Sequence, residues 1–144
     1  MMKWSVLSVV LLLMLGVAAC GSGGDAKPTM LHVTRNEELS GYDFAPLDVT
    51  VRDVNAIQHL YQAAYALPKP PSGTINCPND IGLTYHLEFF EGDTSVQQMD
   101  LDATGCQFLQ ITHDEVRMSD GGFRESLRKL IGIPSLVPPI PGRP

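Results

Sequence analysis

Apolar and polar residues alternate along five short stretches of the chain, which is the pattern of β-strands with one buried and one exposed face. These stretches lie at residues 30–35, 47–52, 83–89, 96–103 and 106–112. Tight turns at 91–94 and 103–105 separate the last three stretches. We therefore expect those three to form an antiparallel meander, with the two N-terminal strands beside it.

Two other stretches repeat apolar residues at helical spacing. From Val54 to Tyr65 the apolar positions recur every three or four residues, between Asp53 as the predicted N-cap and Pro68, which ends the helix. A second helix is predicted after Asp120, another N-cap. Its apolar face consists of Phe123, Leu127, Leu130 and Ile131.

The predicted order is strand, strand, helix, then three strands and a final helix, which indicates the α+β class. We expect a small antiparallel sheet, made of the three-stranded meander plus one or two N-terminal strands, with two helices packed on one face. The clean alternation implies that the other face is exposed to water. Residues 29–133 are expected to form this single domain, and the Pro-rich tail at 134–144 to be extended and mostly unpacked.

The first residues have the features of an export signal: a basic start at Lys3, an apolar run over 6–15, and small residues before Cys20. The apolar run is short for a spanning helix, which needs roughly 20 apolar residues. One interpretation is an ordinary signal peptide cut after Ala19, which leaves Cys20 as a free thiol. After the cut, residues 20–28 are expected to form a flexible tether.

The string Val17-Ala18-Ala19-Cys20 resembles the lipobox of bacterial lipoprotein precursors, in which an aliphatic residue and two small residues precede the cysteine. The resemblance implies that residues 1–19 are a lipoprotein signal peptide and that Cys20 is acylated and becomes the first residue after cleavage. It also implies a location at the cell membrane or outer membrane, on the extracytoplasmic side. Two acyl chains, at about 0.8 kcal/mol per buried methylene, are enough for stable anchoring.

Charge narrows the possible partners. The chain contains 10 Lys and Arg against 16 Asp and Glu, a formal net charge of −6. Removing residues 1–19 removes one charge, Lys3, and gives −7. Nucleic acids and anionic lipid surfaces require positive charge, so we expect no nucleic-acid partner. The membrane contact is expected through the lipid on Cys20, and the other partner is an unknown envelope protein or small ligand.

Cys77 and Cys106 remain once Cys20 is assigned to the lipid, and an even pair in an exported domain indicates a disulfide. A bridge closing this loop is expected to contribute roughly 3–4 kcal/mol of stability. The alternative is a reactive or metal-binding pair. That alternative has little support, because the sequence shows neither a CxxC spacing nor a histidine at a metal-ligand interval from either cysteine.

The stretch from Leu67 through Cys106 is similar to that of small uncharacterised bacterial lipoproteins, which have Cys-Pro-x-Asp-x-Gly-x-x-Tyr and then Gly-Cys after two strands. The matching residues are Cys77, Pro78, Asp80, Gly82, Tyr85, Gly105 and Cys106. The resemblance implies no known activity. We interpret these residues as a structural signature.

Three acids are the candidate surface binding residues. Asp100 and Asp102 point the same way on their strand, and Glu88 is expected across from them on the neighbouring strand. Such a cluster suits calcium or acid–base catalysis, but calcium sites usually draw on loops, whereas these acids lie on regular strands. The alternative, which we favour, is the solvated face of a half-exposed sheet.

The sequence contains no motif for catalysis or metal binding that we recognise. No serine-nucleophile elbow or phosphate-binding loop is present, and no pair of histidines has a zinc-binding interval. We therefore expect no catalytic residue, no metal and no cofactor. The four histidines of the chain are His32, His59, His86 and His113.

Together these patterns predict a lipid-anchored extracytoplasmic lipoprotein of the cell envelope, acting as a non-catalytic binding or accessory module. One alternative is a secreted protease inhibitor, because a disulfide-stapled sheet with a stiff proline loop at 69–72 resembles subtilisin-inhibitor-like proteins at the level of the fold. The other alternative is an envelope hydrolase that uses Glu88, Asp100 or Asp102.

Overall fold

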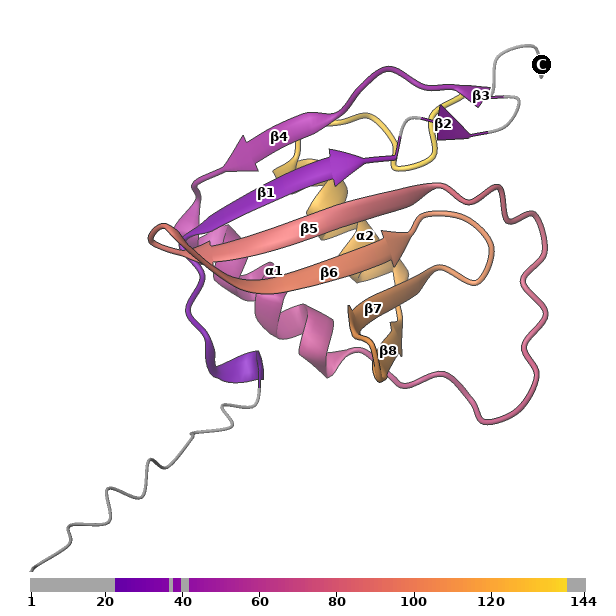
Figure 1. Ribbon diagram of the computed structural model, residues 1–144, viewed down its shortest axis with the longest axis horizontal. Helices are drawn as coiled ribbons and strands as arrows, with labels where there is room; N and C mark the ends of the chain where they lie inside the picture. Colours follow the sequence, from indigo (N-terminus) through magenta and orange to yellow (C-terminus); the bar gives the residue numbers. More distant parts are fainter. Residues whose placement is uncertain (1–22, 37, 40–41, 140–144) are drawn as a thin grey trace, which may run out of the picture.

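The computed structural model describes residues 23–36, 38–39 and 42–139 (Figure 1). Within these residues a six-stranded sheet is formed in the order β4-β1-β5-β6-β7-β8, with every neighbouring pair antiparallel. In chain order the elements are the 3₁₀-helix η1 (Gly23–Asp25), β1 (Met30–Arg35), β2 (Glu38–Leu39), β3 (Tyr42–Asp43), β4 (Asp48–Val51), α1 (Val54–Ala66), β5 (Thr84–Glu91), β6 (Thr94–Asp102), β7 (Phe108–Thr112), β8 (Glu115–Met118) and α2 (Gly121–Leu130).

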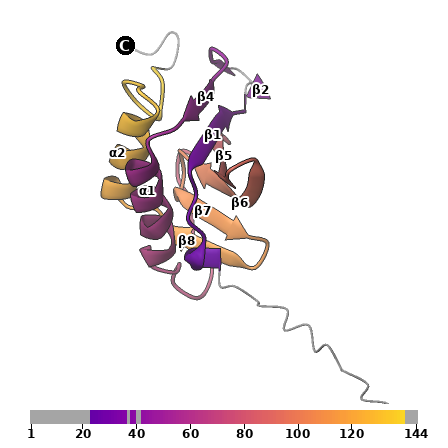
Figure 2. The same ribbon diagram turned by 90° about the vertical axis from the view of Figure 1, so that its left-hand side faces the viewer.

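The sheet and the helices form two layers. Figure 2 shows α1 and α2 side by side against one face of the sheet. The predicted α+β fold is confirmed, with the five predicted strands and two helices in the predicted order. The meander has one more strand than predicted, because the chain turns again after β7 and adds β8 at the edge. A separate short pair, β2 with β3, was also not predicted.

Strict alternation along the strands builds the core. In β1 every second residue is buried, and β5 repeats this pattern as far as Phe89. Each fully buried leucine or phenylalanine contributes about 1.5–3 kcal/mol to folding, so these rows fix which face meets the helices. The strand residues of the core are Leu31, Val33, Tyr85, Leu87, Phe89, Met99, Leu101, Leu109 and Ile111.

Both helices begin at the predicted caps. The carboxylate of Asp53 accepts a hydrogen bond from the Ala56 amide at 3.1 Å, and that of Asp120 accepts one from the Phe123 amide at 2.7 Å. Helix α1 buries Ile57, Leu60, Tyr61 and Ala64. Val54, expected on the same apolar face, is 40% exposed, because it stands in the first turn.

The two ends of the described chain pack closer to the domain than the composition suggests. A Cβ placed on Gly24, in the expected tether, would meet the Tyr65 ring at 3.5 Å, and Pro28 is buried. The expectation of an unpacked tail is wrong as far as Leu136, which is buried in the core. The buried Tyr85 hydroxyl needs an acceptor, and the Leu136 carbonyl provides it at 2.9 Å.

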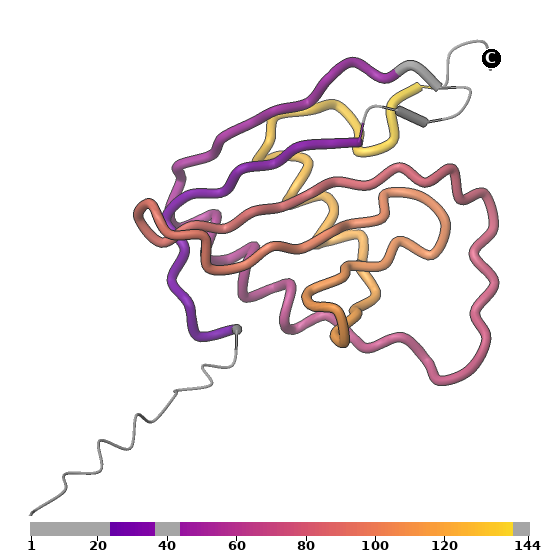
Figure 3. The backbone as a smooth tube through the Cα atoms, in the orientation of Figure 1, coloured from indigo at the N-terminus to yellow at the C-terminus, as the bar shows by residue number. Residues whose placement is uncertain are grey.

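A long segment connects α1 to β5 and passes around one end of the sheet (Figure 3). Its first residues run along the edge strand β8: the Met118 amide donates to the Pro68 carbonyl at 2.8 Å, and Arg117 donates to the Leu67 carbonyl. This segment carries the proline loop at 69–72 and then Cys77.

Candidate functional site

The sheet face turned away from α1 and α2 is the candidate site, and we call it the open face. It is made of the strand residues that alternate with the buried ones, and no described helix covers it (Figure 2). Its polar residues include His32, Thr34, Asp48, Thr50, Thr84, His86, Glu88, Ser95, Gln98, Asp100, Asp102, Gln110 and Thr112.

A shallow depression of about 340 Å³ lies at the centre of the open face, over β1, β5 and β6. This volume is at the lower end of the range for small-molecule sites, about 300–1,000 Å³. The polar side chains that line it are His32, Thr34, His86, Glu88, Gln98 and Asp100.

Two histidine–carboxylate pairs each connect two adjacent strands on the open face. Nδ1 of His86 lies 2.7 Å from Oδ1 of Asp100, its partner in the β5–β6 register. Nε2 of His32 lies 2.9 Å from Oδ1 of Asp48 on β4. The side chains of His86 and Asp100 are 52% and 53% exposed, so this pair remains accessible to a ligand.

The register corrects one detail of the sequence prediction. Glu88, Asp100 and Asp102 all lie on the open face, as expected, but Glu88 stands opposite Gln98 and not opposite either aspartate. Gln98 donates a hydrogen bond from Nε2 to Oε1 of Glu88 at 2.9 Å. Asp102 instead stands opposite Thr84, whose hydroxyl donates to Oδ1 at 3.3 Å. The three acids are therefore separate positions rather than one cluster.

The local environments shift the pKa values of two of these acids in opposite directions. Hydrogen bonds from Gln98 and then Ser95 lower the pKa of Glu88, and the nearby His32 acts in the same direction. Burial raises the pKa of Asp102, helped by the neighbouring carboxylates of Asp80 and Asp100 and opposed by the Thr84 hydroxyl. Glu88 therefore carries a firm negative charge at the centre of the open face.

The chemistry that this arrangement supports is hydrogen bonding and ion pairing. Within the described residues no group of three or more His, Cys, Asp and Glu side chains is arranged to hold a metal ion. The two histidines of the open face, His32 and His86, are instead each paired with one carboxylate. Carboxylates, amide oxygens and imidazoles in rows suit a ligand that donates hydrogen bonds or carries positive charge.

A larger hollow of about 560 Å³ lies between α1 and α2, on the other layer of the molecule. Its lining is mostly apolar, with Ala56, Leu60 and Ala63 from α1. The Lys129 ammonium at this hollow lies 3.4 Å from an oxygen of the Glu125 carboxylate, which also pairs with Arg128. This hollow therefore offers fewer polar groups for recognition than the open face does.

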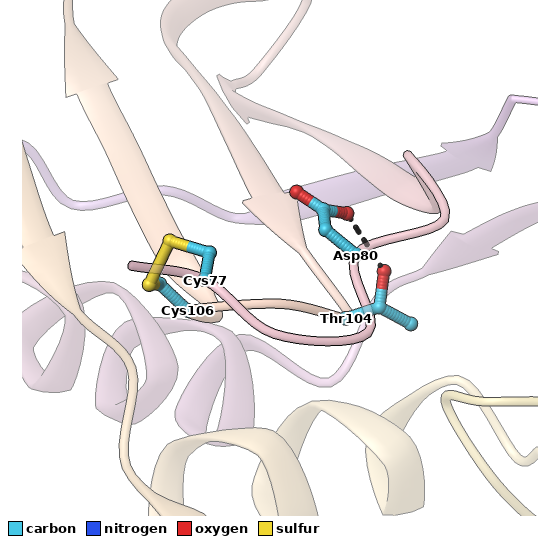
Figure 4. Close-up of a disulfide and its surroundings, with 4 residues drawn as sticks. All are labelled: Cys77, Asp80, Thr104 and Cys106. Atoms are coloured by element: carbon cyan, nitrogen blue, oxygen red, sulfur yellow. Dashed lines mark hydrogen bonds between the residues drawn. A yellow bond between two sulfur atoms is a disulfide. The ribbon is translucent and has the colours of Figure 1, made fainter. Parts of the chain in front are cut away.

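The predicted disulfide is confirmed: Cys77 is bonded to Cys106, with the Cα atoms 4.8 Å apart (Figure 4). Cys106 lies in the turn between β6 and β7, because β7 begins only at Phe108. The bridge therefore joins the α1–β5 segment to this turn, and not to the start of the third meander strand.

Asp80 makes the second link between the same two segments. Its Oδ1 accepts a hydrogen bond from the Thr104 hydroxyl at 3.1 Å (Figure 4) and another from the Gly82 amide at 2.9 Å. Thr104 in turn accepts a hydrogen bond from the Ile81 amide at 3.2 Å. The bridge and these bonds hold the entry to β5 against the end of β6, which is a structural role.

Glu88, Asp100 and Asp102 are predicted from the sequence as surface residues, whereas the pairing of His32 with Asp48 is not. His32 and Asp48 form their pair across β1 and β4, and only the order of these strands brings them together. The signal available in the sequence was the alternation, which places both residues on the polar side of their strands. Cys20, the predicted lipidation site, lies outside the described residues.

Comparison with known proteins gives no match: no family model matches the chain, and neither does any curated protein or any solved structure. In the part of the chain that the structure describes, neither helix has the length and apolar character needed to span a bilayer.

Proposed function

We propose that this chain is a lipid-anchored extracytoplasmic lipoprotein of the cell envelope, and that it acts as a non-catalytic binding module through its open face. The leader pattern ending in Val17-Ala18-Ala19-Cys20 supports the anchor. The polar, accessible residues of the open face support the binding role, since they form a depression without a metal-type cluster among the described residues.

The observation that carries this proposal is the bridge between Cys77 and Cys106. Disulfides persist in oxidising compartments and are rare in the cytosol, so a bridged domain is compatible with export. The chain has three cysteines, and with two of them bridged Cys20 is the one left for acylation. The position of Cys20 directly after small residues is where the proposal requires it.

The decisive experiment is intact-mass analysis of the full chain extracted from membranes of the native host. We expect cleavage before Cys20, a mass increase matching diacylglycerol with or without a further acyl chain, and a further gain of two hydrogens on reduction of the bridge. The Cys20→Ser variant should lose the lipid and leave the membrane fraction.

The matched control is the Cys77→Ser/Cys106→Ser variant, which removes the same kind of side chain but keeps the leader. It should remain acylated and membrane-bound, because the anchor does not depend on the bridge. An unlipidated native protein in the soluble cytosolic fraction would show that the proposal is wrong.

A further inference from the structure

The two faces of the sheet differ in charge, and only one of them is covered by the helices. Histidines aside, the described strands contain two basic residues, Arg35 and Arg117, and both lie on the helix side of the sheet, opposite Tyr85 and Leu109. The open face has no Lys or Arg at any described strand position. Its carboxylates are those of Asp48, Glu88, Asp100 and Asp102.

Apolar side chains border the acidic centre at one corner of the open face. Phe108 alternates with the buried Leu109, so it lies on the open side of β7, and it is half-buried. Met118 stands opposite Phe108 on β8 and is 36% exposed. An acidic surface with an apolar border is complementary to a segment that is basic and carries an apolar side chain.

We propose that the open face binds a basic segment of a partner protein, with Lys or Arg side chains paired to Glu88 and Asp100. This inference rests on the proposed role of the open face as a binding surface, and it names the chemistry of the partner. An apolar side chain of the same segment packs on Phe108 and Met118. The depression at the centre of the face has room for one or two long side chains rather than for a folded domain.

The strength of the ion pairs with the basic segment depends on how far the Glu88 and Asp100 side chains are exposed to solvent. Glu88 and Asp100 stand on adjacent strands near the middle of the sheet, and half of the Asp100 side chain is exposed, so each ion pair with a partner is partly screened by water. Each pair alone contributes little, but several pairs along one face select a basic partner and reject an acidic one. Binding is therefore expected to weaken as the salt concentration rises.

The test measures fluorescence anisotropy of a labelled peptide of about eight residues, enough to cross six strands at roughly 4.8 Å spacing. The peptide alternates lysine with threonine and ends in phenylalanine, and its counterpart has glutamate in place of lysine. The protein is the full chain, purified in detergent with the bridge oxidised. We expect the lysine peptide to bind at low salt and to bind only weakly above about 0.3 M NaCl. The glutamate peptide should not bind.

Charge-removing variants locate the site. Glu88→Gln/Asp100→Asn keeps the shape of both side chains, and we expect it to weaken lysine-peptide binding about fivefold to tenfold. The matched control is Asp93→Asn/Asp114→Asn, which changes the net charge by the same amount in exposed turns away from the depression. The control should change the affinity less than about twofold.

Three results would overturn the inference: no binding of the lysine peptide, equal weakening by the two double variants, or a dimer that Glu88→Gln/Asp100→Asn dissociates, since a second copy would then occupy the face. The acylation experiment does not use the open face. A lipidated protein that fails to bind the lysine peptide therefore refutes this inference alone, while an unlipidated cytosolic protein refutes the proposed cellular role.

Discussion

Gly105→Ala is the substitution whose effect can be worked out most fully from the structure. Gly105 has φ +65, and an ideal Cβ at this position would lie 2.8 Å from both Cβ and Cγ of Asp80. Asp80 cannot simply move away, because its carboxylate holds the Gly82 amide and the Thr104 hydroxyl. The substitution therefore combines an unfavourable backbone conformation with a steric conflict.

The size of the effect is the sum of two contributions. Placing a non-glycine residue in the left-handed region opposes folding by about 1–2 kcal/mol. Displacing Asp80 weakens two hydrogen bonds, each with a net value of about 0.5–1.5 kcal/mol. We expect a loss of about 2–5 kcal/mol in the free energy of unfolding, the upper end applying if both hydrogen bonds are lost, which lowers the urea midpoint by roughly 1–2.5 M.

The assay is urea unfolding of the oxidised protein, with free thiols quantified so that every sample has the bridge intact. Gly92→Ala is the matched control, because Gly92 has φ +61 and a Cβ there would meet nothing within 4 Å. It should lose only the backbone contribution, about 1–2 kcal/mol. Equal losses for the two variants would refute the claim that the approach of Asp80 to Gly105 matters.

Three further predictions concern stability. Opening the Cys77–Cys106 bridge, which closes a separation of 29 residues, should remove roughly 3–4 kcal/mol in urea unfolding; superimposable curves with and without reductant would contradict this. Arg35→Lys should lower the free energy of unfolding by about 2–4 kcal/mol in the same assay. The guanidinium lies 5.5 and 5.8 Å from the ring centroids of Phe44 and Tyr85, and it donates hydrogen bonds to the Tyr85 hydroxyl and the Ala45 carbonyl, an arrangement that an ammonium cannot reproduce. Unchanged stability would contradict this prediction. Burial raises the pKa of Asp102, so ionisation opposes folding and stability falls as pH rises through the native-state pKa. Asp102→Asn should therefore be more stable than the parent at pH 7, with the difference vanishing near about pH 3; a difference independent of pH would be the contrary result.

The edge strand β8 shows where local patterns become too weak to predict structure. Its four residues, Glu115 to Met118, alternate polar and apolar, but four residues with two charges look equally like a loop. The strand exists because β7 offers it a partner and because the segment after α1 supplies an acceptor, the Pro68 carbonyl, for the Met118 amide. These partners are distant in sequence, so no local signal announces them.

The pairing of β5 with β6 depends in the same way on packing. The hairpin turn pairs Glu91 with Thr94, and an unbroken ladder from there would set Tyr85 opposite Asp100, with a buried side chain facing an exposed one. A bulge between Phe89 and Phe90 shifts the ladder by one residue, so Asp100 meets His86 instead. The burial of the apolar row is what makes this irregularity favourable.

Local sequence patterns were enough to predict the features that depend on neighbouring residues: the alternation of the strands, the caps at Asp53 and Asp120, the two-layer α+β class, and the polar character of one sheet face. It also paired Cys77 with Cys106 by count. Only packing between distant segments established which polar residues meet, that Leu136 is buried, and that Arg117 on β8 lies on the helix side of the sheet. The physical reason is that periodicity tells which side of a strand is apolar, whereas register and contacts between distant segments depend on how the whole core packs.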